Sequence, residues 1–216
     1  MKTRFVCDRR VQCIPPWLML SLVLMPALAV SAAPQGWREV VFEGHTKYRQ
    51  VDGCWHALAQ GTASGLVREQ EVDLNQTPWL TWQWRGEVTP RWSDSPEQSK
   101  GGDDFQARVY VVKKGGLPWR TRAINYVWSR DAEPGAHWPN PFASQAEMVV
   151  VQGPGGTGAW HRFTRNVQAD FKRFHGIEVD TVDAVAIMTD GDNTGTRVSS
   201  CYRLPVFRAD APDQRE

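Results

Sequence analysis

The sequence lacks the motifs that mark common catalytic and nucleotide-binding sites. It contains no G-x-S-x-G nucleophile elbow, no phosphate-binding loop ending in Gly-Lys-Ser/Thr and no H-E-x-x-H metal motif. Its five histidines and four cysteines show no spacing that suits zinc. Lysine and arginine never stand in a run of more than two, as in Lys113-Lys114, and the formal net charge is only +1. The sequence therefore predicts no zinc site and no nucleic-acid partner.

Long apolar runs are also absent, apart from one near the N-terminus. Residues 17–30 are apolar, follow a basic head and precede the small residues Ser31, Ala32 and Ala33. This order is typical of a secretory signal peptide, and the run is shorter than the roughly 20 residues that span a bilayer. We expect residues 1–32 to be a signal peptide, with a periplasmic or secreted product and no permanent membrane anchor. Residues 33–216 then form a single domain, which is large enough for a hydrophobic core.

Cysteine is scarce beyond this segment. Only Cys54 and Cys201 follow residue 32. An oxidising compartment permits a disulfide between them, which would tie an early strand to the last one. Two buried free thiols are the alternative, and the sequence favours neither.

Helical patterns are few, and alternating β-rich segments separated by Gly, Pro, Asn and Asp dominate the chain. The clearest is 79–88, where Leu80, Trp82 and Trp84 share one face. Asp52-Gly53 predicts a tight hairpin turn. The candidate strands are residues 39–43, 46–51, 55–59, 65–72, 79–88, 105–112, 123–128, 147–151, 160–165, 182–188 and 198–207. The pattern predicts an all-β fold with one short helix, a two-sheet antiparallel β-sandwich of the jelly-roll type.

The one predicted helix begins after Asn166, which can cap it, and ends at Gly176, which can adopt the left-handed conformation. Val167, Phe171 and Phe174 fall on one stripe, so we expect this helix to pack against an end of the sheets.

Three motifs carry a resemblance to a known family. They are residues 78–84 (PWLTWQW), 102–111 (GDDFQARVYV) and 185–194 (VAIMTDGDNT). With these motifs in this order, the chain from about 41 to 207 resembles the bacterial exported family catalogued as domain of unknown function 3047. The resemblance implies no activity. In shape alone, segment 187–207 is similar to the closing strands of galactose-binding-like jelly rolls in carbohydrate-binding modules, and a fold does not give a function.

The chain is rich in tryptophan, with eleven in all. Trp92, Trp119 and Trp138 have turn residues beside them, and we take them as candidates for an exposed platform on which a sugar ring stacks. The alternative, that they cover the ends of the sandwich, is favoured for each tryptophan taken singly.

Asp103, Asp104 and Arg108 are candidate ligand-binding residues at the start of segment 105–112. Two carboxylates can act as acid and base in glycoside hydrolysis. Neighbouring residues on an extended chain point apart, however, so an ion pair between one aspartate and Arg108 is the favoured interpretation.

Asp190, Asp192 and Asn193 are candidate calcium ligands, because oxygens alternate in D-G-D-N-T-G as at the start of a calcium loop. Position twelve of such a loop is Cys201 rather than glutamate. An ordinary turn is therefore favoured, and no cofactor other than calcium is considered.

The leading functional hypothesis is a module that binds a glycan or another cell-envelope polymer. The alternatives are a polysaccharide hydrolase or lyase that uses Asp, Arg or His side chains, and a structural partner of an envelope protein. A binding module is preferred to an enzyme because no motif assigns a reaction.

Overall fold

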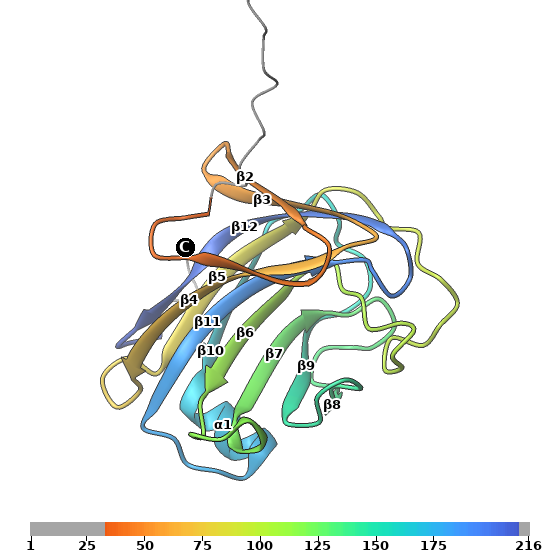
Figure 1. The fold of residues 1–216 in the computed structure, drawn as a ribbon. Helices are drawn as coiled ribbons and strands as arrows, with labels where there is room; N and C mark the ends of the chain where they lie inside the picture. The colour runs from red at the N-terminus through yellow and green to blue at the C-terminus, as the bar shows by residue number, and fades with distance from the viewer. Residues whose placement is uncertain (1–32, 212–216) are drawn as a thin grey trace, which may run out of the picture. The chain divides into compact units, whose positions relative to one another are not determined.

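The protein is described here by a computed structural model that covers residues 33–211 (Figure 1). The predicted signal peptide, residues 1–32, lies outside the described residues. Among the described residues, no helix combines the length and the apolar character needed to cross a bilayer.

Two β-sheets face each other and confirm the predicted sandwich (Figure 1). The seven-stranded sheet has the order β1-β4-β11-β6-β7-β9-β8, and the five-stranded sheet has the order β10-β5-β12-β3-β2. All pairs are antiparallel except β7 and β9, which run parallel. The strands are β1 (Arg38–Glu43), β2 (Lys47–Val51), β3 (Cys54–Gln60), β4 (Ala63–Asp73), β5 (Trp79–Gly86), β6 (Arg108–Lys113), β7 (Arg122–Trp128), β8 (His137–Pro139), β9 (Ala146–Gln152), β10 (His161–Asn166), β11 (Thr181–Asp190) and β12 (Arg197–Arg208).

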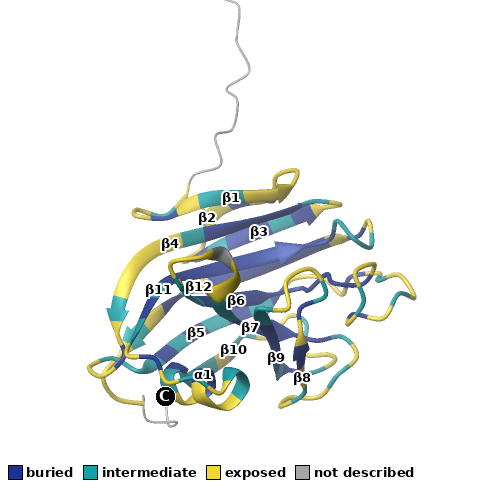
Figure 2. Ribbon diagram, turned by 60° about the horizontal axis from the view of Figure 1, so that its bottom comes forward, coloured by how far each residue is buried: buried dark blue, intermediate teal, exposed yellow. Residues whose placement is uncertain are grey.

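The main core lies between the two sheets and is built by alternation along the strands. On β5, Leu80, Trp82 and Trp84 are buried, as predicted. Trp82 stacks on Tyr126 of β7 in the opposite sheet, with ring centroids 5.2 Å apart. Figure 2 shows the buried residues concentrated along the middle of the strands. Large aromatic areas removed from water in this way are the main favourable contribution to the fold.

The predicted helix is confirmed as α1 (Val167–His175). The side chain of Asn166 accepts a hydrogen bond from the backbone N–H of Ala169, and Gly176 ends the helix with φ = 67°. Val167 and Phe171 are buried in the main core. Because α1 connects β10 of one sheet to β11 of the other, its apolar stripe covers the sandwich where the chain changes sheets.

The eleven predicted strands are all present, with ends that differ by a few residues. The turn between β2 and β3 has positive φ at both Asp52 and Gly53, the geometry of a tight hairpin. One strand, β8, was not predicted, because its three residues end in a proline and give no periodic signal. A 3₁₀-helix at Pro118–Arg120 was not predicted either.

A disulfide joins Cys54 of β3 to Cys201 of β12, with the Cα atoms 5.7 Å apart and a sequence separation of 147. The two strands are neighbours in the five-stranded sheet. The structure therefore shows the disulfide and not the two free thiols, the alternative that the sequence left open.

Replacing both cysteines, Cys54→Ser with Cys201→Ser, is expected to lower the free energy of unfolding by about 2–5 kcal/mol. Without the disulfide the unfolded chain gains the conformational entropy that the long closed loop had removed. Urea unfolding of the oxidised protein and of the variant measures this difference. Equal midpoints with equal slopes would show that the bridge contributes nothing.

Candidate functional site

A pocket of about 420 Å³ opens on the outer face of the seven-stranded sheet. Its lining residues on β6, β7 and β11 alternate with the residues that point into the main core, so the pocket and the core lie on opposite faces of the same sheet. The lining residues are Phe42, Glu43, Ala63, Asp103, Arg108, Tyr110, Asn125, Asn140, Phe142, Ala143, Ala146, Met188, Asp190, Asp192 and Asn193.

Arg108 is the central charge of the pocket, and its side chain is only 3% exposed. Its Nε donates to Oδ1 of Asp190 at 2.9 Å, and its Nη2 donates to Oδ2 of the same carboxylate. Nη2 also donates to the backbone carbonyl of Asp103, and Nη1 lies 3.5 Å from Oδ2 of that residue. A bidentate pairing of this kind holds both side chains in one orientation, and its hydrogen bonds are strong because both groups are charged and buried. The predicted pair of Arg108 with an aspartate therefore exists, with Asp103, but Asp190 is the closer partner.

Two buried acceptor atoms line the pocket without a donor. Within residues 33–211, no hydrogen-bond donor reaches Oδ1 of Asp103 or Oδ1 of Asn125. The other carboxylate oxygen of Asp103 accepts from Nδ2 of Asn140 at 3.0 Å, and Nδ2 of Asn125 contacts the sulfur of Met148. A buried acceptor left in this state costs about 1–3 kcal/mol. Two residues of the pocket lining, Asp103 and Asn125, thus each keep one buried acceptor whose hydrogen-bonding capacity is unused.

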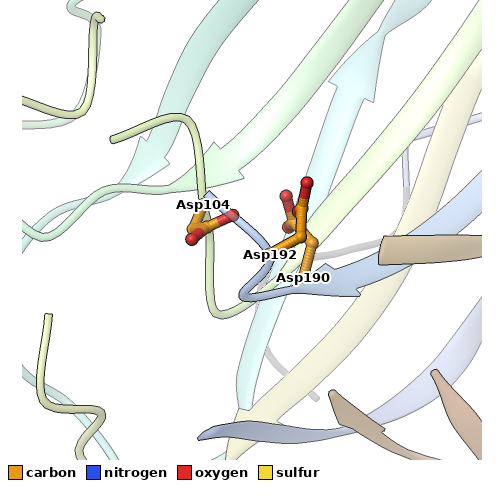
Figure 3. A group of neighbouring side chains, drawn as sticks. All are labelled: Asp104, Asp190 and Asp192. Atoms are coloured by element: carbon orange, nitrogen blue, oxygen red, sulfur yellow. The ribbon is translucent and has the colours of Figure 1, made fainter. Parts of the chain in front are cut away.

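Asp104 points away from Asp103, as predicted for adjacent residues on an extended chain. Its carboxylate accepts from the backbone N–H of Asn193 at 3.2 Å and from both the N–H and the hydroxyl of Thr194 at 2.6 Å. Figure 3 shows it beside Asp190 and Asp192, which stand at the end of β11 and in the turn that follows. Asp104 therefore fastens the segment before β6 to this turn.

The same three aspartates lie close enough to suggest a cation, since one oxygen of each falls within 4.8 Å of the others. Their hydrogen bonds do not suit calcium. Three donors engage the carboxylate of Asp104, and Arg108 and the N–H of Phe105 engage that of Asp190. A guanidinium against the cluster repels a second cation, and the side chain of Asn193 donates to Asp192 instead of presenting its oxygen. These hydrogen bonds support the interpretation of this segment as an ordinary turn and not as a calcium site.

Burial raises the pKa of two of these carboxyls, Asp190 and Asp192. It raises the pKa of Asp192 to about 6, and the nearby charge of Asp104 acts in the same direction. Burial also raises the pKa of Asp190, while the Arg108 charge lowers it. Because Arg108 donates to both oxygens of Asp190, this geometry accommodates the ionised carboxylate. Asp192 is therefore the carboxyl of the pocket whose charge changes just below neutral pH.

Two exposed aromatic side chains stand in the wall of the pocket. Phe42 is 66% exposed and sits at a β-bulge of β1, where the register with β4 shifts. Phe142 is 56% exposed and follows β8, with the ammonium of Lys100 5.4 Å from its ring centroid. Bulges re-aim side chains, which explains why Phe42 faces outward. Neither residue was singled out from the sequence.

The three predicted tryptophan platforms do not converge on this pocket. The expectation that Trp138 is exposed is wrong: it is 8% exposed and packs in a second apolar cluster with Phe105, because the strand β8 turns it inward against β9. Trp92 lines a different pocket beside Arg130, whose guanidinium lies 5.0 Å from its ring. Trp119 is 62% exposed on the 3₁₀-helix and lines neither pocket.

The protein is a β-sandwich with a pocket on the outer face of its larger sheet. A protein-family model described as "Protein of unknown function (DUF3047)" matches residues 35–204, and the chain belongs to this family, as the three sequence motifs predicted. No curated protein matches the chain significantly.

Solved structures with a similar chain course include the following three. The family 11 carbohydrate-binding module of Clostridium thermocellum, in complex with a β-1,3-1,4-mixed-linked tetrasaccharide, has 8% identity and a TM-score of 0.42 over 82% of this chain and 91% of its own. The family 11 xylanase of Neocallimastix patriciarum has 11% identity and a TM-score of 0.46, covering 83% and 94%. The xyloglucanase domain of NopAA from Sinorhizobium fredii, in complex with cellobiose, has 6% and 0.46, covering 83% and 95%. Similarities of this size assign no role to this chain.

Arg108→Met is expected to lower the free energy of unfolding by about 3–5 kcal/mol, because it leaves the carboxylate of Asp190 buried without its cation. The double variant Arg108→Met with Asp190→Leu recovers most of the loss, since no charge remains to be buried. Urea unfolding at neutral pH measures both. Arg38→Met, which removes an exposed partner of Glu69, is the control and costs less than about 1 kcal/mol. A double variant no more stable than Arg108→Met would contradict this account.

Proposed function

We propose that the chain is an exported glycan-binding protein that holds a saccharide in the pocket on its seven-stranded sheet. Export rests on the signal-like pattern of residues 1–32. Binding rests on one observation: the acceptors Oδ1 of Asp103 and Oδ1 of Asn125 are buried without donors in a pocket that also exposes Phe42 and Phe142.

A saccharide supplies what this arrangement needs. Its hydroxyl groups are donors for the two acceptors, and the C–H face of a sugar ring packs on an aromatic side chain. Pockets for small ligands combine a mostly apolar lining with a few fixed polar groups, and here the alanines, Met188 and the two phenylalanines provide the apolar part.

The charge of the pocket favours a neutral or amino-bearing sugar over an acidic one. Four carboxyl side chains line it, from Glu43, Asp103, Asp190 and Asp192, against the single guanidinium of Arg108. Asp190 already engages that guanidinium on two nitrogens. An anionic ligand would therefore meet repulsion with no free cation in the lining to offset it.

Phe142→Ala is expected to weaken retention of the protein on a neutral polysaccharide about fivefold to tenfold, because one aromatic contact contributes about 1–1.5 kcal/mol. Affinity gel electrophoresis over a panel of soluble neutral polysaccharides measures this. Asn125→Leu, which has the same side-chain branching, removes one acceptor and weakens binding in the same direction.

Trp119→Ala is the matched control, since Trp119 is equally exposed but lies outside the pocket lining. It should bind as the wild type does. The proposal is contradicted if the wild-type protein migrates unretarded on every polysaccharide of the panel. It is also contradicted if Phe142→Ala and Trp119→Ala have equal effects.

A second candidate function, glycoside hydrolysis, is favoured by a different observation. Asp103 and Asp192 line the same pocket, and burial raises the pKa of Asp192 to about 6. Glycoside hydrolysis uses one carboxyl as a general acid and a second carboxyl as base or nucleophile. Asp190 is excluded from either role because Arg108 holds both of its oxygens.

If the protein hydrolyses glycans, the release of reducing ends should fall as the pH rises through about 6, where Asp192 loses its proton. Asp192→Asn should abolish release while leaving retention on the polymer. A wild-type protein that binds a polysaccharide and releases no reducing ends between pH 4 and 8 would leave binding as the function.

A further inference from the structure

We propose that the outer face of the five-stranded sheet is a second binding surface, which takes an acidic polysaccharide through its carboxylate groups. This face presents six cationic side chains from four of its strands, and we call it the basic face. They are Lys47, Arg49, Arg85, Arg162, Arg203 and Arg208. The inference is independent of the pocket, which lies on the other sheet.

Strand register places these cations on the side away from the core. Arg85 pairs with Cys201, which pairs with His56, which in turn pairs with Arg49. Paired residues in neighbouring strands share a face, so this row crosses four strands. The residues next to them in sequence, such as Tyr48, Trp84 and Tyr202, point into the core.

A second row crosses three strands, in which Arg162 and Arg203 both pair with Gln83. Since neighbouring strands lie about 4.8 Å apart, the two arginines stand roughly 10 Å from each other across the sheet. Both side chains are exposed. The basic face therefore carries cations on both sides of the sheet's middle strands.

The charges of this array are largely uncompensated. Within residues 33–211, Arg85 is the one of the six with a carboxylate partner, Glu87 at 3.5 Å, and Glu87 also contacts His56 at 2.7 Å. On the other sheet, Arg38 and Lys114 pair with Glu69 and Lys113 pairs with Asp183. Arg68 and Arg122 of that sheet have no carboxylate partner among the described residues. The whole chain is near neutral, with a formal net charge of +1, so the positive field of this face arises from placement.

Trp160 fixes two of the guanidiniums. The guanidinium carbons of Arg85 and Arg203 lie 5.1 Å and 4.8 Å from its ring centroid. Cation–π contacts of this kind hold an arginine fork in place, and a fork that is already ordered loses less entropy when it meets a planar carboxylate. The face thus suits groups that accept two parallel N–H bonds.

Two other anionic partners fit less well. Base-stacking platforms are central to single-stranded nucleic-acid binding, and the guanidiniums occupy the ring of Trp160. Insertion into a membrane surface needs several exposed apolar side chains. On the described strands of this sheet, Val206 is the one large apolar side chain that is exposed. A uronate polymer needs neither stacking nor insertion.

The test uses immobilised polygalacturonate and, as a matched neutral ligand, its fully methyl-esterified form. The wild-type protein should bind the first and not the second, and its affinity should fall steeply with salt. The double variant Arg162→Gln with Arg203→Gln should weaken binding by about tenfold or more, since it removes two charge-assisted contacts. Trp160→Leu leaves the charge unchanged and should also weaken binding. Near-ultraviolet circular dichroism and thermal melting show whether each variant is folded.

Arg38→Gln with Lys114→Gln is the control, because it removes the same charge from the other sheet and should bind as the wild type does. The proposal is overturned if polygalacturonate and its ester bind equally, if the control loses as much affinity as the basic-face variant, or if anionic phospholipid vesicles or single-stranded DNA bind more tightly than polygalacturonate. Phe142→Ala should leave this binding unchanged, so that failure here and failure of the pocket proposal are distinguishable.

Discussion

The buried pair of Arg108 and Asp190 is the constraint on which the pocket depends. It joins the first residue of β6 to the last residue of β11, so it fixes the ends of two neighbouring strands at the level where both leave the sheet. The same guanidinium binds the carbonyl of Asp103, and the carboxylate also accepts from the N–H of Phe105. The segment before β6 is thereby held over the sheet, and it closes one side of the pocket. A pair of this kind contributes little net stability, but its geometry is costly to break.

The surplus of carboxyl groups around this pair explains how the pocket stays open to a ligand. Asp104 is satisfied by three donors from the turn after β11, and the raised pKa of Asp192 reduces the negative charge below about pH 6. Asp103 is the carboxylate that keeps an oxygen without a donor. Its position is set by Arg108 and Asn140, neither of which can reach that oxygen as well. The protein therefore pre-forms an acceptor at a cost that a ligand with a donor would repay.

Local sequence patterns predicted most of the fold and only part of the site. Alternation placed Trp82 and Trp84 in the core, and cap residues placed α1, because these signals depend on neighbours in the chain. The pairing of Arg108 with Asp190 spans 82 residues, and no local pattern encodes such a contact. Trp138 was placed wrongly because its turn-rich flanks indicated exposure, whereas the short strand β8 buries it against β9. Phe42 escaped notice because a bulge, which the alternation does not reveal, turns it outward.

The outer faces of the two sheets carry different charged side chains, and strand alternation permits this difference. Each sheet gives one side chain in two to the shared core, so its outer residues are free to vary without disturbing the packing. On the seven-stranded sheet the outer residues collect carboxylates around one arginine, and on the five-stranded sheet they collect arginines around Trp160. The core separates the two sets of charges, so a ligand on one face neither shields nor competes with a ligand on the other. Under the two proposals above, a near-neutral chain would bind a donor-rich ligand on one face and an acidic ligand on the other.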